Sequence, residues 1–200
     1  MPCGSGEGDT MNKKHQILNA AAKLFATQGF DGTTTLQIAT EADVTEPLIY
    51  YHFKGKDELF TSILQMAFEK YFARLENLPR NTSNQFERIA NLIDLHFAIV
   101  DEMPNETFLV MNTCPVKLND PDHVCRTNID RQKEWLTDYL TQCLTEGMHR
   151  SEFLEISVAP TVELLLGILS GLTRRRALKL DSNPQVRTET INFCRRALQG

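Results

Sequence analysis

Residues 34–59 read TTLQIATEADVTEPLIYYHFKGKDEL, and this stretch decides the fold class of the chain. Thr34 and Gln37 have the spacing of a capping box, which predicts that a helix begins at this point. After a break in the helical pattern, Thr45 and the early Pro47 predict a second short helix, because proline is tolerated in a first helical turn. Two short helices joined by a tight turn are typical of a helix-turn-helix.

The residue types of this segment suit the two roles that a helix-turn-helix plays on DNA. Its first helix crosses the backbone, and its second helix lies in the major groove with its N-terminal residues at the base edges. Hydroxyl groups suited to phosphate lie at the start of the first helix, in Thr33, Thr34 and Thr35. The candidate base-reading residues are Thr45, Glu46, Pro47 and Leu48. Groups that can reach phosphate follow in Tyr50, Tyr51, His52 and Lys56.

Helical periodicity continues on both sides of the segment. Upstream, apolar residues at three-to-four spacing predict a helix that ends before Gly29: Ile17, Ala21, Leu24 and Phe25. Downstream, an apolar stripe predicts a long helix that runs to Pro79: Leu59, Ile63, Ala67, Tyr71 and Leu75. Further helices are expected at about 84–101, 106–113, 124–146, 158–180 and 185–198. With no strand-like alternation, the sequence predicts an all-α chain with a small N-terminal unit and a larger helical bundle.

Composition supports a globular protein and excludes several other classes. The chain has 200 residues, of which 42% are hydrophobic and 24% charged, so collagen-like and wholly disordered chains are excluded. The longest apolar run, 164–172, is far shorter than a membrane span. Residues 1–10 have neither the basic nor the apolar region of a secretory signal and are expected to form a flexible tail. We therefore expect a cytoplasmic protein without a membrane partner.

The net charge of the chain does not indicate whether it binds nucleic acid. The net charge is −5, and residues 11–60 contain five lysines against six acidic residues. A polybasic coat is thereby excluded, and any contact with DNA must depend on where individual charges lie.

Within this context, residues 34–59 resemble the signature of the TetR/AcrR family of transcriptional repressors. The matching positions are Thr34-Thr35, Ile38-Ala39, Ala42, Val44, Tyr50, Phe53, Lys56 and Leu59. Residues 13–30 resemble the first helix of the same family. The resemblance implies a homodimer that reads two half-sites of a double-stranded DNA operator, and a C-terminal domain whose small-molecule ligand releases the DNA. Repression is the usual activity of the family and is not deduced from these residues.

The family pattern also implies roles for individual residues. Backbone contacts fall on Thr34, Thr35, Tyr50, His52 and Lys56, and base-facing roles fall on Thr45, Glu46, Pro47 and Tyr51. Glu46 is a departure, since its carboxylate repels phosphate but can accept a hydrogen bond from cytosine N4. It can equally be a first-turn charge that complements the helix dipole. Tyr50 and Tyr51 have an alternative interpretation as half-buried packing residues. Gly55 replaces a more usual serine and is a slightly weaker cap.

The larger domain offers candidates for a ligand pocket. Apolar and aromatic side chains at helical spacing between 85 and 135 are first of all expected in the core, and some of them can line a cavity. The candidates for the pocket are His96, Phe97, Phe108, Met111 and Trp135. No motif for a cofactor or a metal is present, so none is expected.

The five cysteines are scattered and odd in number, which argues against a disulfide framework and for a reducing compartment. Cys114, His123 and Cys125 lie within twelve residues of each other, which leaves a metal- or redox-responsive regulator as an alternative. Their spacing does not match a structural zinc site, and buried inert thiols are the favoured interpretation.

The predicted helix at 158–180 is the candidate for a dimer interface. Together with the last helix it supplies the candidate interface residues Val162, Leu165, Leu166, Leu169 and Phe193. Gly167 and Gly171 permit close approach of a second helix, and two helices from each subunit would form a four-helix interface. The alternative is a helix that is buried within one chain.

These observations divide the chain into a tail at 1–10, a helix-turn-helix domain at 11–56, and a ligand-binding and dimerisation domain at 57–200. We expect a DNA-binding regulator and not an enzyme, because no nucleophile-base pair, carboxylate dyad or metal site has a convincing spacing. An all-α enzyme or a helical scaffold is the remaining alternative.

Overall fold

The computed structural model describes residues 6–180 and 183–200, and within these ranges it contains helices and no strand. The helices are α1 (Gly6–Gln28), α2 (Thr35–Glu41), α3 (Glu46–His52), α4 (Lys56–Glu76), α5 (Gln85–Glu102), α6 (Pro104–Lys117), α7 (Val124–His149), α8 (Val158–Ala177) and α9 (Val186–Gln199). The all-α prediction is confirmed. None of these described helices is both long enough and apolar enough to cross a membrane.

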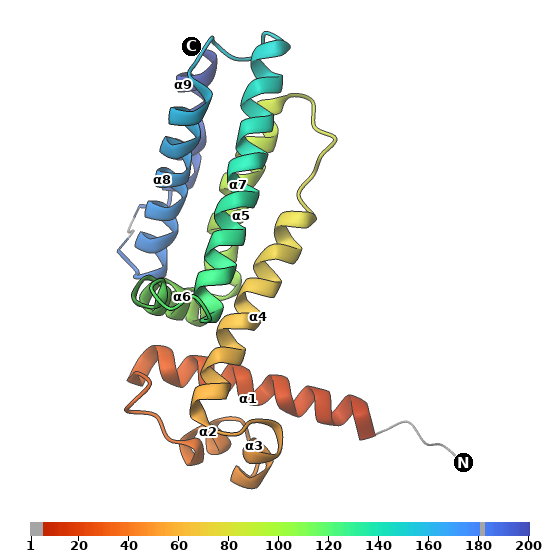
Figure 1. The fold of residues 1–200 in the computed structure, drawn as a ribbon, viewed down its shortest axis with the longest axis vertical. Coiled ribbons are helices and arrows are strands. Elements are labelled where there is room, and N and C mark those ends of the chain that lie inside the picture. The colour runs from red at the N-terminus through yellow and green to blue at the C-terminus, as the bar shows by residue number, and fades with distance from the viewer. Residues whose placement is uncertain (1–5, 181–182) are drawn as a thin grey trace, which may run out of the picture.

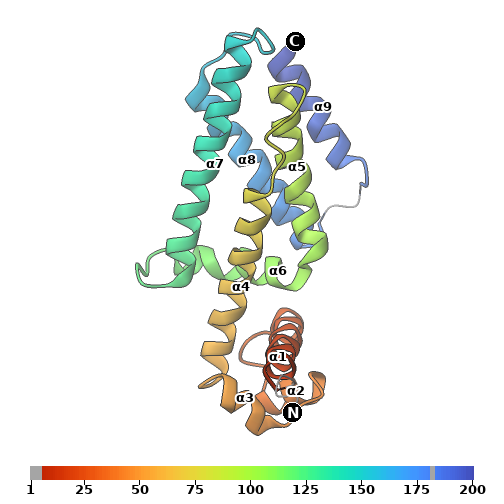
Figure 2. The ribbon, with the colours of Figure 1, turned by 90° about the vertical axis from the view of Figure 1, so that its right-hand side faces the viewer.

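The molecule is elongated, with a small unit at one end and a helical bundle at the other (Figures 1 and 2). Helices α1, α2 and α3 form the small unit, and α4 leads from it into the bundle of α5, α7, α8 and α9. Helix α6 lies across the base of the bundle, where it packs against both α1 and α4. This position makes α6 a direct connection between the two parts.

The bounds of several helices differ from the sequence prediction. Helix α1 begins at Gly6, so the part of the expected 1–10 tail that the structure describes is helical, and residues 1–5 lie outside the described ranges. Helix α6 runs from Pro104 to Lys117 and contains Pro115, whereas the sequence predicts a helix at about 106–113. Proline is compatible with a first helical turn, which explains the earlier start.

The base of α4 is held to the small unit by aromatic packing. The rings of Phe25, Phe30 and Phe60 lie in mutual contact, with centroids 5.3–5.4 Å apart. The predicted apolar stripe of α4 is buried throughout, from Leu59 to Leu75. One long helix therefore belongs to the hydrophobic core of both parts, which couples their positions.

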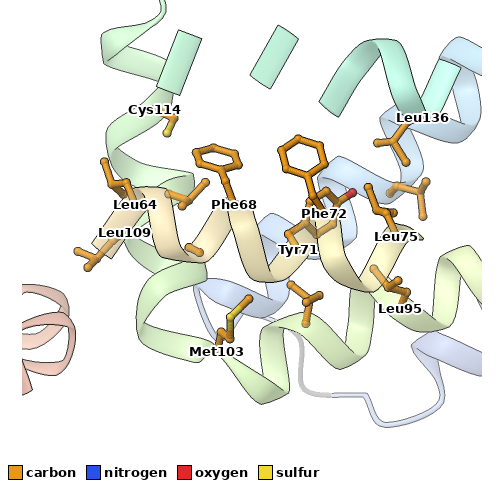
Figure 3. Packing of buried hydrophobic residues seen from close by; sticks show 14 of the residues in the cluster. Leu64, Phe68, Tyr71, Phe72, Leu75, Leu95, Met103, Leu109, Cys114 and Leu136 are labelled. Carbon is orange, nitrogen blue, oxygen red and sulfur yellow. The ribbon is translucent and has the colours of Figure 1, made fainter. Parts of the chain in front are cut away.

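The upper half of α4 is enclosed by the other helices of the bundle. Figure 3 shows its apolar side chains among residues of neighbouring helices: Leu64, Phe68, Tyr71, Phe72 and Leu75 on α4, with Leu95, Met103, Leu109, Cys114 and Leu136 around them. All of them are buried. The aromatic rings on α4 supply much of this core, since each buries a large apolar area.

The expectation that the cysteines are inert thiols is wrong for two of them. Cys114 on α6 and Cys125 on α7 form a disulfide across eleven residues, with their Cα atoms 5.1 Å apart. The turn between the two helices brings these residues within the range that a disulfide requires, which the spacing alone does not reveal. Cys143 and Cys194 are free and buried, as expected, and Cys3 lies outside the described residues.

Candidate nucleic-acid interface and ligand cavity

The turn between α2 and α3 has the geometry that the sequence predicted. Thr34 accepts a hydrogen bond from the Gln37 N–H at 3.2 Å, and the Gln37 side chain accepts one from the Thr34 N–H at 2.8 Å, so the capping box is confirmed. Asp43 takes a positive φ of 51° in the turn. Its neighbour Val44 donates to the Ala39 carbonyl at 3.0 Å, which closes the turn.

Helix α3 exposes its two tyrosines. The side chain of Tyr50 is 54% exposed and that of Tyr51 is 76% exposed, so neither is a packing residue of this chain. Thr45 and Pro47 at the start of α3 are also exposed. Leu36 on α2 is exposed as well, and sequence reasoning missed it because a leucine in an amphipathic pattern is ordinarily assigned to the core.

In the free protein, three of the residues that are predicted to bind DNA form hydrogen bonds with each other. The Thr35 hydroxyl donates to the Glu46 carboxylate at 2.5 Å and lies 3.2 Å from the Tyr50 hydroxyl. Because the single Thr35 proton is given to Glu46, Tyr50 donates to Thr35. Glu46 thus fastens α3 to α2, which is a role that neither sequence interpretation of this carboxylate included.

The Lys56 ammonium points inward. It donates to the Phe30 carbonyl at 2.7 Å and to the Thr33 carbonyl at 3.1 Å, and it lies 4.3 Å from the centroid of the Phe30 ring. Two of its three N–H groups are therefore used to hold the loop between α1 and α2 against the start of α4. One N–H group is left for a phosphate.

The structure also bears on three other polar residues of the DNA-binding unit. Thr33 is buried and its hydroxyl donates to the Gly29 carbonyl at 2.8 Å, so the expectation that it contacts phosphate is wrong. His52 is half-buried, and its Nε2 atom has no hydrogen-bond partner among the described residues. Lys54 is exposed just after α3 and was missed, although a lysine beside a reading helix is a usable signal.

Replacing Lys56 by methionine is expected to lower the free energy of unfolding by about 1.5–3 kcal/mol, because two hydrogen bonds from a charged donor and a cation–π contact are lost. Urea denaturation followed by circular dichroism measures the change. Lys54→Met, which removes an exposed lysine two residues away, is the control and should shift the midpoint little. Equal effects of the two substitutions would contradict the inward role of Lys56.

The bundle contains a cavity of about 470 Å³ between α4, α5, α6, α7 and α8. Its wall is mainly apolar, and its polar side chains include Tyr71, His96, Thr107 and Gln132. A second cavity of about 270 Å³ shares several wall residues with the first: Val110, Met111, Ile129 and Ser170. An apolar enclosure with a few polar groups is the usual form of a small-molecule site.

Two of the five predicted pocket residues, His96 and Met111, line the main cavity. Phe97 is instead buried near the Arg176 guanidinium, 5.7 Å from its ring centroid, and Trp135 stacks on Tyr139 with centroids 4.9 Å apart. Neither of these, nor Phe108, is among the described residues that line the main cavity. Sequence reasoning missed the wall residues on α4, because its apolar stripe looks like ordinary core.

A buried pair of polar residues lines the main cavity. His96 donates from Nδ1 to the Leu92 carbonyl at 2.8 Å, so Nε2 accepts a hydrogen bond from the Tyr71 hydroxyl at 3.1 Å. Burial lowers the pKa of His96 and raises the pKa of Tyr71. Both side chains are thus neutral at pH 7, and the Tyr71 oxygen keeps lone pairs that can accept a further hydrogen bond.

The lowered pKa of His96 predicts that acid destabilises the protein. Below the ordinary pKa of 6.5 the unfolded chain binds a proton at this imidazole and the folded protein does not, so the free energy of unfolding falls as the pH decreases. We expect a loss of about 1.4 kcal/mol per pH unit down to the folded pKa. Urea unfolding between pH 7.5 and 5 measures this slope, and His96→Gln should have a shallower one. Identical slopes would contradict the prediction.

The structure revises the candidate dimer interface. Val162, Leu165 and Leu169 are buried within their own chain, and half-buried Leu166 lines the main cavity. The sequence predicts these residues at the interface because helical spacing does not distinguish a face that packs inside the chain from one that packs outside. Phe193 is 57% exposed as an interface residue should be.

A different part of α8 remains free. Leu164 is 68% exposed, and Gly167 and Gly171 are exposed with open space where a Cβ atom would lie, Gly167 beside the main cavity and Gly171 beside the second. An exposed leucine beside two exposed glycines leaves room for another helix to approach.

A helix-turn-helix with exposed tyrosines, joined to a bundle that encloses an apolar cavity, defines the class of DNA-binding transcriptional regulators. Residues 17–63 match the sequence model of the family described as "Bacterial regulatory proteins, tetR family". The helix-turn-helix part of the chain is therefore similar to the DNA-binding domain of TetR-family transcriptional regulators.

Relatives of known name agree with this assignment. The regulator HbdR of Aromatoleum sp. (strain CIB) is 28% identical over 138 residues, which are 69% of this chain and 60% of that protein. The repressor KstR2 of Mycobacterium tuberculosis (strain H37Rv) is 25% identical over 147 residues, which are 72% of this chain and 73% of that protein. The aligned part therefore spans less than two thirds of HbdR.

Solved structures share the fold along nearly the whole chain. The ketosteroid transcriptional regulator KstR2 of M. tuberculosis superposes with a TM-score of 0.73 at 21% identity, over 94% of this chain and 95% of its own. The regulator FadR from Bacillus subtilis, in complex with stearoyl-CoA, superposes with a TM-score of 0.65 at 19% identity, over 92% of this chain and 98% of its own.

Proposed function

We propose that the protein is a homodimeric repressor, released from its operator when a mainly apolar small molecule occupies the cavity between α4 and α8. The observation that carries this proposal is that α6 both lines the cavity, through Thr107 and Val110, and packs against α1 of the DNA-binding unit. A ligand that favours another position of α6 would move α1, and the recognition helices of the dimer would no longer match adjacent major grooves.

The chemistry of the wall supports an uncharged group inside the cavity. Tyr71 and His96 are both neutral, and an ionised ligand group beside them would lose its hydration without a charged partner. Lys133 and Glu163 also line the cavity, are exposed, and can meet polar groups at its mouth. The stearoyl-CoA of the B. subtilis regulator, an apolar chain with a polar end, fits the same description.

For the DNA-binding unit we propose contacts from exposed Thr34, Thr45, Pro47 and Tyr51 and from half-buried His52. Thr35, Glu46, Tyr50 and Lys56 would contact DNA after rearrangement of their internal hydrogen bonds. For the dimer we propose the exposed face of α8 and α9, with Leu164 and Phe193 at its centre. The division at residues 56 and 57 into a DNA-binding part and a ligand-binding part remains our working proposal. We place the protein in the cytoplasm beside its operator and assign it no enzymatic activity.

Selection from a pool of random DNA duplexes tests the proposal. We expect enrichment of a palindrome whose affinity falls steeply with salt, because several phosphates are contacted in each half-site. Absence of enrichment, together with weak binding that is insensitive to salt, would overturn the assignment as an operator-binding repressor.

A second experiment tests the cavity with defined probes. Dodecan-1-ol and dodecanoate carry the same chain length and differ in the charge of the head group. We expect the alcohol to displace an uncharged fluorescent dye such as N-phenyl-1-naphthylamine at the lower concentration, and to weaken operator binding. Preferential displacement by dodecanoate would contradict an uncharged site.

A further inference from the structure

We propose that the disulfide between Cys114 and Cys125 is a reversible redox modification site that sets the mobility of α6. The proposed substrate is a small thiol or dithiol reductant, and the reverse reaction uses a hydroperoxide. This inference rests on the proposed function in one respect only, namely that α6 transmits the state of the bundle to DNA.

The position of the disulfide is the first observation. Cys114 lies in the last part of α6 and Cys125 at the start of α7, and the bond closes the turn between these helices. Helix α6 also packs against α1 and α4 (Figure 1). The disulfide therefore tethers the C-terminal end of the helix that connects the cavity to the DNA-binding unit.

The side-chain hydrogen bonds that hold this end of α6 to neighbouring helices come from two arginines. Arg174 on α8 donates to the Met111 carbonyl at 3.1 Å, and Arg126 on α7 donates to the Leu118 carbonyl at 3.2 Å. Both arginines are exposed, so each hydrogen bond contributes little compared with a covalent link. Breaking the disulfide would consequently remove the strongest restraint on this part of the helix.

Access to the sulfur atoms is the second observation. Cys114 and Cys125 are at most 1% exposed, which excludes a folded protein reductant from direct contact. Cys114 nevertheless lines the 270 Å³ cavity, together with Pro115 and Arg174. A small thiol can enter a space of this size. This cavity shares wall residues with the main cavity. A ligand bound in the main cavity would therefore hinder access of the reductant to Cys114.

The remaining described cysteines do not compete for the disulfide. Burial raises the pKa of Cys143 to about 11 and also raises the pKa of Cys194. Because the thiolate is the attacking species in thiol–disulfide exchange, these two thiols are unreactive at neutral pH. The exchange is thereby confined to the pair on α6 and α7.

The proposed chemistry is balanced in both directions. In reduction, a thiolate of a small dithiol attacks one sulfur of the disulfide and forms a mixed disulfide. The second thiol then closes the reductant to its own disulfide, and Cys114 and Cys125 each gain a proton. In oxidation, a hydroperoxide converts one cysteine to a sulfenic acid and leaves as an alcohol. The partner thiol displaces water and re-forms the bond.

The expected consequence is a change in operator affinity. With the disulfide in place the C-terminal end of α6 is restrained, and without ligand the DNA-binding units of a dimer are held ready for adjacent grooves. Reduction lets α6 sample other positions, which lowers the fraction of competent dimer and raises the apparent Kd by the same factor. We expect a Kd about 3- to 10-fold higher after reduction, a range within ordinary allosteric coupling.

The experiment compares the full chain after treatment with hydrogen peroxide and after treatment with dithiothreitol. Peptide mapping without reduction should recover a linked peptide containing Cys114 and Cys125 from the first sample only. Hydrogen–deuterium exchange should be faster in α6 of the reduced sample, and operator binding should be weaker. Cys125→Ser should behave as the reduced protein in both samples, whereas Cys143→Ala should respond like the parent chain.

The readouts separate failure of this inference from failure of the proposed function. A missing linked peptide, or exchange in α6 that is the same in both samples, would overturn the redox site whatever the protein does on DNA. A linked peptide with altered exchange but no operator binding would leave the redox site standing and reject the repressor. Equal operator affinity of both samples, with altered exchange, would overturn the control of DNA binding.

Discussion

Tyr50→Ala is expected to weaken binding to every DNA sequence by about 10- to 100-fold, since a hydrogen bond to a charged phosphate contributes about 1.5–3 kcal/mol. The Tyr50 hydroxyl donates to Thr35 in the free protein at 3.2 Å, and the ring is 54% exposed. The hydroxyl can therefore turn to a phosphate without loss of core packing. Affinity for the selected operator and for an unrelated duplex, measured by fluorescence anisotropy at fixed salt, checks the prediction.

The controls separate a lost contact from a general loss of structure. Tyr50→Phe removes only the hydroxyl and should retain most of the defect of the alanine variant if phosphate contact is the cause. Val116→Ala truncates a side chain that is 76% exposed on α6, outside the helix-turn-helix, and should bind DNA like the parent protein. Wild-type affinity of Tyr50→Ala for both duplexes would show that this tyrosine does not touch DNA.

Ile129→Trp is expected to abolish release of the operator by ligand while leaving operator binding intact. Ile129 is half-buried on α7 and lines both cavities, so a larger ring at this position occupies the space that the ligand needs. We expect an effect of dodecan-1-ol on operator affinity that is about 5- to 150-fold weaker, because overpacking of a filled site costs about 1–3 kcal/mol. The measurement is titration of the protein–operator complex with the alcohol.

A matched substitution on the same helix tests whether the site matters. Thr127→Trp places the same ring on an exposed position two residues away, where it meets neither cavity. This control should keep the response to the alcohol. If both variants respond like the parent chain, the ligand is bound elsewhere. If Ile129→Trp fails to bind operator at all, α7 is part of the DNA-competent state and the simple blocking mechanism is wrong.

Local signals in the sequence were sufficient for the DNA-binding unit. The capping box at Thr34 and the proline in the first turn of α3 are local features that lie within one helical turn. Residue spacing therefore specifies them directly. The buried stripe of α4 follows from periodicity for the same reason. The sequence did not indicate which polar groups of this unit form hydrogen bonds within the protein. Lys56, for example, donates to two carbonyls of a loop more than twenty residues away.

For the bundle, local signals in the sequence were not sufficient. Periodicity identified its helices but not what each face meets, so Leu165 and Leu169 were assigned to a partner subunit although they pack inside the chain. Tyr71 and His96 are twenty-five residues apart on different helices, and nothing in their local sequence indicates that they share a hydrogen bond and a cavity.

The sequence by itself therefore determined the all-α class and the helix-turn-helix, because these depend on contacts between residues close in the chain. Only the tertiary structure decided the cavity, the exposed face of α8 and the disulfide between Cys114 and Cys125. Each of these depends on how helices distant in sequence pack together. Packing is set by the shapes of many side chains at once, and no short pattern of residues encodes it.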